Sequence, residues 1–467
     1  MEPNLTGIAS RLEAKAASFV KENRLPGAAV GVVHGDHLIW FAGVGFADVA
    51  TRRVPDASTL YRIASITKTF TGTAIMQLRD EGRLNLDDAA VKHLPELREA
   101  RSPFGEIEHL TIRRMLSHES GLQSEPPDTD WRLGRYDGAV ERNLARMKDV
   151  GVAVPPNTQQ KYSNLAYQLL GEIVSRLSGT RYVDYVRSSI LDPLGLSTTS
   201  YEPLPDTLAN RCATGYAARS FSDELNVSIT APTTFAEGGL WSCVKDLARW
   251  VSFQFREDGG ARGGTQVLSG ASLREMHVPR YIGDEAWTEA WCIAWYATRK
   301  GDVVWIQHSG GLHGFRTDVC FDPKHRVGAI ALINGVGDAA ALAIDLATIA
   351  RSAVAAEAPR IEPPETMPEA YRPLLGFYFA DDIGLLIRLE WRDGKLIVIA
   401  TDDPAWRPTL KPTDNPDVFV IEPGTRQSGE RAVFRRLADG RVAAVFLAAG
   451  TYSRLEPVGA PEGVVAS

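Results

Sequence analysis

Apolar and polar positions follow two different rhythms along most of the chain. Two β-rich runs within residues 28–46 flank a Gly-Asp turn, which predicts a two-stranded hairpin. After residue 65 the apolar positions recur every three or four residues, first over 70–78 and most clearly over 165–177, and this period indicates helices. A glycine follows each of these two runs, Gly82 and Gly179, and glycine is a common helix stop.

Strand signals return in the second half of the chain. They cover residues 292–297, 303–307, 316–321 and 327–333. A segment of small residues, 339–355, then predicts a further helix. Since strand signals come from both ends of residues 1–355, with helices between them, we expect an α/β domain in which helices flank a sheet and an α-rich lobe occupies about 70–240.

The composition changes after residue 355. Five prolines within fifteen residues predict a stiff linker over 356–373. Beyond it, residues 374–467 have an all-β pattern, in which apolar runs flank Asp393-Gly394 and Asp439-Gly440, two strong hairpin signals. Several short strands at this spacing predict a small β-barrel or sandwich.

Composition and charge restrict the classes of function. The chain has 467 residues, 44% apolar and 23% charged, which is typical of globular proteins. With 51 Lys and Arg against 58 Asp and Glu, the net charge is −7, so we expect no nucleic-acid partner. The four cysteines lack zinc-ligand spacing and predict mostly buried free thiols. We expect neither a metal site nor a cofactor.

No membrane or export segment is predicted. The most apolar stretch, 327–350, is interrupted by Asn334, Asp338 and Asp345, which favours a strand followed by a helix over a membrane span. The first residues lack the basic and apolar regions of an export signal, so the expected location is cytoplasmic and no membrane partner is expected. The oligomeric state stays open.

Ser65-Ile66-Thr67-Lys68 is the first candidate for chemistry. On a helix, residues i and i+3 share a face, so the serine hydroxyl and the lysine amine can meet. A serine needs a base to become a nucleophile, and burial makes a lysine easier to deprotonate. Two more Ser-x-x-Lys copies, Ser18–Lys21 and Ser242–Lys245, have structural interpretations, Ser18 in a surface helix and Ser242 as a helix N-cap.

Two further motifs follow in the chain. Tyr162-Ser163-Asn164 precedes the 165–177 helix, where a tyrosine can move protons and an asparagine can hold a lysine and a carbonyl group. His308-Ser309-Gly310, extended by Gly311, follows the strand 303–307, where glycine allows close approach of a substrate and a free N–H can complete an oxyanion hole. For each motif alone, a buried tyrosine or a strand-end histidine is the competing interpretation.

The three motifs in this order resemble those of the serine β-lactamase and penicillin-binding-protein superfamily, in its class C-like branch of esterases, D-amino-acid peptidases and carboxypeptidases. The spacings of 97 and 146 residues between Ser65, Tyr162 and His308 are of the right order. The resemblance covers about residues 15–350 and includes Met115 to Leu122 and Gly238-Gly239-Leu240. It implies an antiparallel sheet flanked by helices, and the C-terminal residues resemble the lipocalin-like barrel of some members.

The resemblance also implies roles for individual residues. Ser65 would be the acylated nucleophile, Lys68 its general base, and Tyr162 a proton relay. Four further residues would bind substrate: Asn164, His308, Gly310 and Gly311. Within this group, Asn164 would bind the substrate carbonyl, the N–H groups of Ser65 and Gly311 would form the oxyanion hole, and His308 would line the site.

Two positions depart from the family pattern. The third motif often begins with lysine, whereas His308 is mostly neutral near pH 7 at a reference pKa of about 6.5. This shifts the expectation from β-lactams and D-Ala-D-Ala towards esters or other amides. Glu237 stands where the family often has a small residue, and either a carboxylate near the cleft that favours a cationic substrate or a solvent-facing side chain fits the sequence.

The sequence therefore predicts a serine hydrolase that cleaves esters or amides through an acyl-enzyme, with a small-molecule ester, amide, β-lactam or short peptide as substrate. A transacylase or peptide cyclase using the same acyl-enzyme is an alternative, and a non-catalytic penicillin-binding sensor or scaffold is another. No Gly-x-Ser-x-Gly, HExxH or Walker-type motif occurs. His118-Glu119-Ser120 is interpreted as structural, since helix-local neighbours rarely form a triad.

Overall fold

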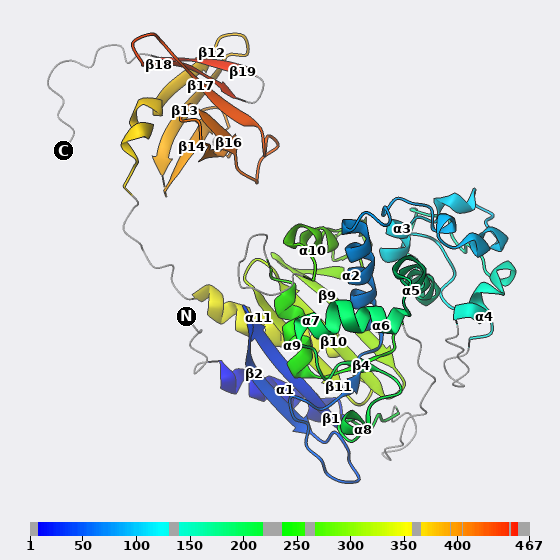
Figure 1. Ribbon diagram of the computed structural model, residues 1–467. Coiled ribbons are helices and arrows are strands. Elements are labelled where there is room, and N and C mark those ends of the chain that lie inside the picture. The colour runs from blue at the N-terminus through cyan, green and yellow to red at the C-terminus, as the bar shows by residue number, and fades with distance from the viewer. Residues whose placement is uncertain are drawn as a thin grey trace. The chain divides into compact units, whose positions relative to one another are not determined.

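The computed structural model divides the chain into two compact units, Met1–Glu357 and Ala358–Ser467 (Figure 1). The residues described are 8–129, 140–217, 236–256, 267–356, 366–392, 394–403, 405–447 and 450–455. Part of the predicted linker, 357–365, lies outside these ranges. Each unit has its own buried apolar core.

An antiparallel sheet of eight strands forms the centre of the first unit, in the order β2-β1-β11-β10-β9-β8-β7-β6. Its strands are β1 (Gly27–His34), β2 (His37–Gly45), β6 (Tyr281–Ile282), β7 (Glu289–Trp291), β8 (Tyr296–Lys300), β9 (Val303–Leu312), β10 (Phe315–Asp322) and β11 (Val327–Ile333). The N-terminal hairpin pairs with the last strand, so both ends of the unit meet in one sheet, as the hydrophobic pattern predicts.

Helices cover both faces of this sheet (Figure 1). One face packs against α1 (Ala9–Glu22) and α11 (Ala339–Ala356), which form one apolar cluster with β1 and β11. The other face belongs to a larger cluster with α2 (Thr67–Asp80), α5 (Asn164–Ser178) and α9 (Val244–Phe253). The α/β fold class is therefore confirmed. Among the described residues no helix has the length and apolarity needed to cross a bilayer.

The remaining elements of this unit are short. The helices are α3 (Ile112–Leu116), α4 (Val140–Leu144), α6 (Tyr182–Val186), α7 (Asp192–Leu194), α8 (Asp206–Ala209) and α10 (Gly270–Met276). A small sheet joins β3 (Tyr61–Arg62), β5 (Leu240–Ser242) and β4 (Ser200–Tyr201). Because β3 leads directly to the turn η2 (Ala64–Ile66), this small sheet holds the segment that carries Ser65.

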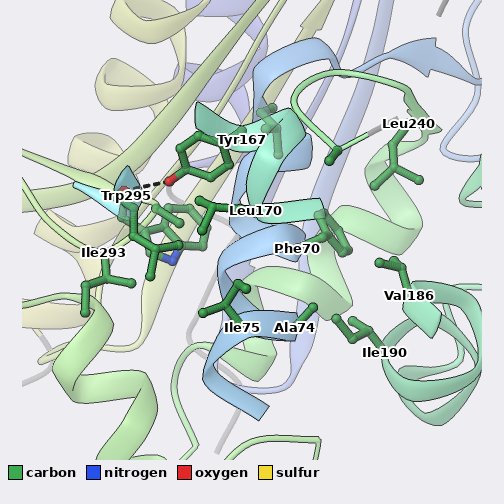
Figure 2. Packing of buried hydrophobic residues seen from close by; sticks show 14 of the residues in the cluster. Phe70, Ala74, Ile75, Tyr167, Leu170, Val186, Ile190, Leu240, Ile293 and Trp295 are labelled. Atoms are coloured by element: carbon green, nitrogen blue, oxygen red, sulfur yellow. Dashed lines mark hydrogen bonds between the residues drawn. The ribbon is translucent and has the colours of Figure 1, made fainter. Parts of the chain in front are cut away.

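Helix α2 lies in the middle of the larger cluster. Figure 2 shows Phe70, Ala74 and Ile75 of α2 packed among buried side chains of α5 and of the segment that follows α6. The Phe70 ring stacks on Trp250 of α9, with 3.8 Å between ring centroids. Burial on all sides makes α2 a rigid support for the residues at its N-terminus.

The second unit is a closed antiparallel barrel of eight strands, which confirms the all-β prediction. The strands are β12 (Gly376–Ala380), β13 (Leu385–Arg392), β14 (Lys395–Ala400), β15 (Thr409–Pro412), β16 (Val418–Ile421), β17 (Arg431–Arg436), β18 (Val442–Leu447) and β19 (Gly450–Arg454). Both predicted hairpins occur, β13 with β14 and β17 with β18. The side chains at alternate strand positions fill the interior.

Three local predictions are wrong. The run 292–297 is mostly a turn, because Ala294 adopts a positive φ of 60° and β8 begins only at Tyr296. The motif that begins at His308 lies inside β9 rather than after it, because β9 continues to pair with β10 through Leu312. Ser242 is not a helix N-cap: it belongs to β5 and hydrogen-bonds the Thr199 hydroxyl, and Cys243 precedes α9.

Candidate active site

Ser65 lies on the turn η2, immediately before α2. Its neighbours Ala64 and Ile66 are buried, whereas Ser65 is half-buried, so Ser65 is the accessible residue of the turn. Ala64 has a left-handed φ of 46°, a conformation that costs energy for a residue with a Cβ atom. Strain of this kind persists where the surroundings over-determine the backbone, and it is concentrated at functional sites.

Lys68 is fully buried and its Nζ contacts three oxygen atoms. Nζ lies 2.7 Å from Asn164 Oδ1, 2.7 Å from the Glu237 carbonyl oxygen and 3.1 Å from Ser65 Oγ. The first two oxygens can only accept hydrogen bonds. A neutral amine has two N–H bonds and one lone pair, so these two acceptors leave the lone pair for the Ser65 hydroxyl.

Asn164 is held at both ends of its amide. It is the first residue of α5, its Oδ1 accepts from Lys68, and its Nδ2 donates to Glu125 Oε1 at 2.5 Å. Ser163 caps the helix by accepting the Ala166 N–H, which fixes the start of α5. The Tyr162 ring centroid lies 5.0 Å from Lys68 Nζ. Two residues of the second motif, Tyr162 and Asn164, therefore lie beside Lys68 of the first motif.

The third motif reaches the same place from the sheet. A Cβ atom on Gly310 would lie 2.1 Å from the Ile63 carbonyl oxygen, so only glycine allows β9 to approach the chain just before Ser65 so closely. Gly311 pairs with Arg316 in the ladder between β9 and β10. His308 is buried, and burial together with Lys68 lowers its pKa to about 3. His308 is therefore neutral at pH 7.

Glu237 is buried, so the solvent-facing interpretation is wrong. Its carboxylate accepts a hydrogen bond from Gln168 Nε2 at 2.7 Å, and its backbone carbonyl accepts from Lys68. The backbone of Glu237 thus contributes directly to the site. A sequence pattern does not report this contact, because any residue type offers a carbonyl group.

Two other side chains were not predicted to belong to the site. Glu125 holds Asn164, and the ring of His118 stacks against Tyr162 with 4.2 Å between centroids. Both residues are far from their partners in the sequence, so the sequence pattern does not predict either contact. Within the described ranges, no group of three His, Cys, Asp or Glu side chains is arranged to hold a metal ion.

Asp318 has a buried carboxyl group that contacts the third motif. Asp318 on β10 is cross-strand from Ser309 and accepts the Ser309 hydroxyl at 2.7 Å, and the Tyr296 hydroxyl lies 2.5 Å from the same Ser309 oxygen. Burial raises the pKa of Asp318 to about 8. The folded protein therefore favours the protonated acid, whereas an unfolded chain ionises it near pH 4.

Asp318→Asn is expected to flatten the pH dependence of stability. Between about pH 4 and pH 8 the wild-type folded state binds a proton that the unfolded state has lost, so its free energy of unfolding falls as the pH rises, by up to roughly 1.4 kcal/mol per unit from this group. Asparagine keeps the shape without the titration. Urea unfolding at pH 5 and pH 8 measures the change in the free energy of unfolding between the two pH values. An equal change in the wild-type and variant proteins would contradict the expectation.

Asp322 on the same strand provides the control. Burial disfavours the charge of its carboxylate, but the pairs with Arg351 and His325 outweigh burial and lower the pKa of Asp322. Asp322→Asn should therefore destabilise the protein at both pH values, because it removes a native ion pair instead of a buried protonated acid.

Comparison with known proteins identifies the family. A family model described as Beta-lactamase matches residues 12–353. The chain belongs to the beta-lactamase family. It is similar to the protein flp of Staphylococcus aureus strain NCTC 8325, with 29% identity over 330 residues, which are 68% of this chain and 61% of the relative. The chain thus spans about three fifths of the length of the curated relatives it matches.

Solved structures of beta-lactamase relatives share the fold. An octameric penicillin-binding protein homologue from Pyrococcus abyssi is 22% identical with a TM-score of 0.63, over 95% of this chain and 99% of that chain. A class C beta-lactamase from Rhodobacter sphaeroides is 21% identical with a TM-score of 0.60, over 73% and 98%. These structures show the fold, and together with the family model over residues 12–353 they confirm the predicted membership of the serine β-lactamase and penicillin-binding-protein superfamily.

Proposed function

We propose that this member of the beta-lactamase family is a serine hydrolase that cleaves ester or amide bonds through an acyl-enzyme on Ser65. The observation that carries the proposal is the contact of Lys68 Nζ with Ser65 Oγ, with two carbonyl oxygens occupying the other donor positions of the amine. This arrangement is what a lysine general base requires.

The reaction proceeds in two steps. Lys68 takes the proton of Ser65, and Oγ forms a bond with the carbonyl carbon of the substrate. The negative charge that develops on the carbonyl oxygen is stabilised by backbone N–H groups of Ser65 and Gly311 beside the N-terminus of α2. The leaving group departs with a proton supplied through Lys68 and Tyr162, and a water molecule then releases the acid and regenerates Ser65.

Neutral His308 favours substrates without a carboxylate beside the scissile bond. A pKa of about 3 leaves no positive charge on the third motif to pair with such a carboxylate. We therefore place esters and uncharged amides first. β-Lactam or D-peptide hydrolysis would be a weak side reaction.

A substrate panel with active-site labelling tests the proposal. p-Nitrophenyl esters, nitrocefin and D-amino-acid amides are compared by kcat/KM, and a fluorophosphonate probe is located by peptide mapping. We expect the esters to be turned over best and the probe to be attached to Ser65. Labelling at another serine, or product formation in fully labelled protein, would contradict the acyl-enzyme.

Addition of an amine or an alcohol to the ester assay tests the transacylase alternative. A hydrolase yields mostly the free acid, whereas a transacylase transfers the acyl group to the added acceptor. A single burst of product without further turnover would instead indicate a sensor.

A further inference from the structure

His118 makes a set of contacts around Tyr162 that the reaction steps above do not use. The residue lies in the segment after α3 and is buried. Its backbone carbonyl accepts the N–H of Lys161 at 2.8 Å, and its ring Nδ1 accepts the N–H of Ser163 at 3.1 Å. These are the two backbone N–H groups on either side of Tyr162, so a single residue binds the chain before and after the tyrosine.

The ring of His118 also fixes the tyrosine side chain. It lies 4.2 Å from the Tyr162 ring, tilted by 31°, and Trp291 of β7 meets the imidazole at 87° with 4.8 Å between centroids. The Trp291 ring contacts Tyr162 as well, at 5.7 Å. The rings of His118 and Trp291 therefore pack against each other and against the ring of Tyr162, which restricts its movement.

The charge state of His118 suits this contact. An Nδ1 atom that accepts an N–H must be unprotonated, so the imidazole is neutral with its proton on Nε2. Burial, the nearby Lys68 and His308 hold the pKa of His118 well below its usual range. The backbone of His118 has a left-handed φ of 59°, and this conformation lets carbonyl and ring reach the same short segment.

We propose that His118 is a positioning residue that holds Tyr162 in place for proton transfer by accepting hydrogen bonds from the backbone N–H groups on both sides of it. This inference rests on the proposed function, in which Tyr162 helps to transfer a proton to the leaving group. A displacement of about 1 Å at such a residue can cost on the order of 100-fold in rate. The imidazole never touches the substrate in this role.

Three substitutions of His118 distinguish the effect of its hydrogen-bond acceptor from the effect of its side-chain size. In His118→Asn, Oδ1 lies the same number of bonds from Cα as Nδ1, and asparagine tolerates a positive φ. In His118→Gln the acceptor lies one bond further out, and His118→Leu has none. With the best ester of the panel, we expect kcat to fall about threefold in the Asn variant and about 10- to 100-fold in the Gln and Leu variants, with KM within twofold.

A double-mutant cycle tests whether the effect passes through the tyrosine. In a Tyr162→Phe background, His118→Leu should lower kcat by less than about twofold, because the hydroxyl group to be positioned is already absent. Multiplicative losses in the double variant, or equal losses in the Asn and Leu variants, would overturn the inference. The cycle stays informative even where one variant has a lower melting temperature.

His277 is the matched control. Its imidazole is also packed against aromatic rings, and burial lowers its pKa to about 3, but its Nε2 contacts Gln254. His277→Asn should lower the melting temperature and leave kcat unchanged. Wild-type kcat in His118→Leu, with Ser65 still labelled by the fluorophosphonate, would overturn this inference alone, whereas failure to label wild-type Ser65 would overturn the proposed function as well.

Discussion

Ser65→Ala is expected to abolish turnover of every ester and amide that the wild-type protein hydrolyses, with a loss of kcat of at least about 1,000-fold. Ser65 Oγ lies 3.1 Å from the buried Lys68 Nζ, and Ser65 is the accessible residue of its turn. Alanine leaves the rest of the site in place but provides no atom to form the bond with the carbonyl carbon. Steady-state assays and loss of fluorophosphonate labelling measure the effect.

The folded state should tolerate this change. The hydroxyl group of Ser65 makes the longest of the three contacts of Lys68, and a neutral hydrogen bond contributes about 1 kcal/mol. The melting temperature should therefore shift by only a few degrees. Ser18→Ala is the control, since Ser18 begins another Ser-x-x-Lys copy but is exposed on α1. Residual activity of Ser65→Ala near that of Ser18→Ala would exclude Ser65 as the nucleophile.

The parts of this site that could be predicted are those that depend on local sequence. The period of apolar residues locates α2 and α5, and the spacing of Ser65 and Lys68 brings their side chains together where η2 leads into α2. The motif order then brings Tyr162 and His308 to the same site through a known resemblance. Local period and spacing alone would not have joined segments 97 and 146 residues apart.

The parts that could not be predicted depend on backbone groups and long-range packing. The Glu237 carbonyl contacts Lys68 across 169 residues, and no side-chain pattern encodes it. The sequence interpretation of His118 as a structural residue is incomplete, because its left-handed φ and its contacts with Tyr162 arise only in the folded chain. The sequence likewise did not predict the burial of Asp318, because β10 is buried at every position except Arg316 and so lacks the alternation that would mark its exposed side.

Lys68→Met is expected to lower kcat by about 100- to 10,000-fold, the range that general base catalysis contributes. Methionine has a similar length and suits a fully buried position, but its side chain has no amine to take the proton of Ser65. Pre-steady-state kinetics with a p-nitrophenyl ester should show that the acylation burst is slowed most. Lys21→Met, in the exposed Ser-x-x-Lys copy of α1, should be as active as the wild type.

Stability separates this loss of chemistry from a loss of structure. Methionine keeps apolar packing at the buried position, but it leaves Asn164 Oδ1 and the Glu237 carbonyl without the donor they share, at about 1–3 kcal/mol for each buried acceptor. These terms oppose each other, so Lys68→Met should stay folded with a modest change in melting temperature. Since the three contacts of Lys68 carry the proposed function, a folded Lys68→Met protein that keeps a normal acylation burst would show that another group activates Ser65.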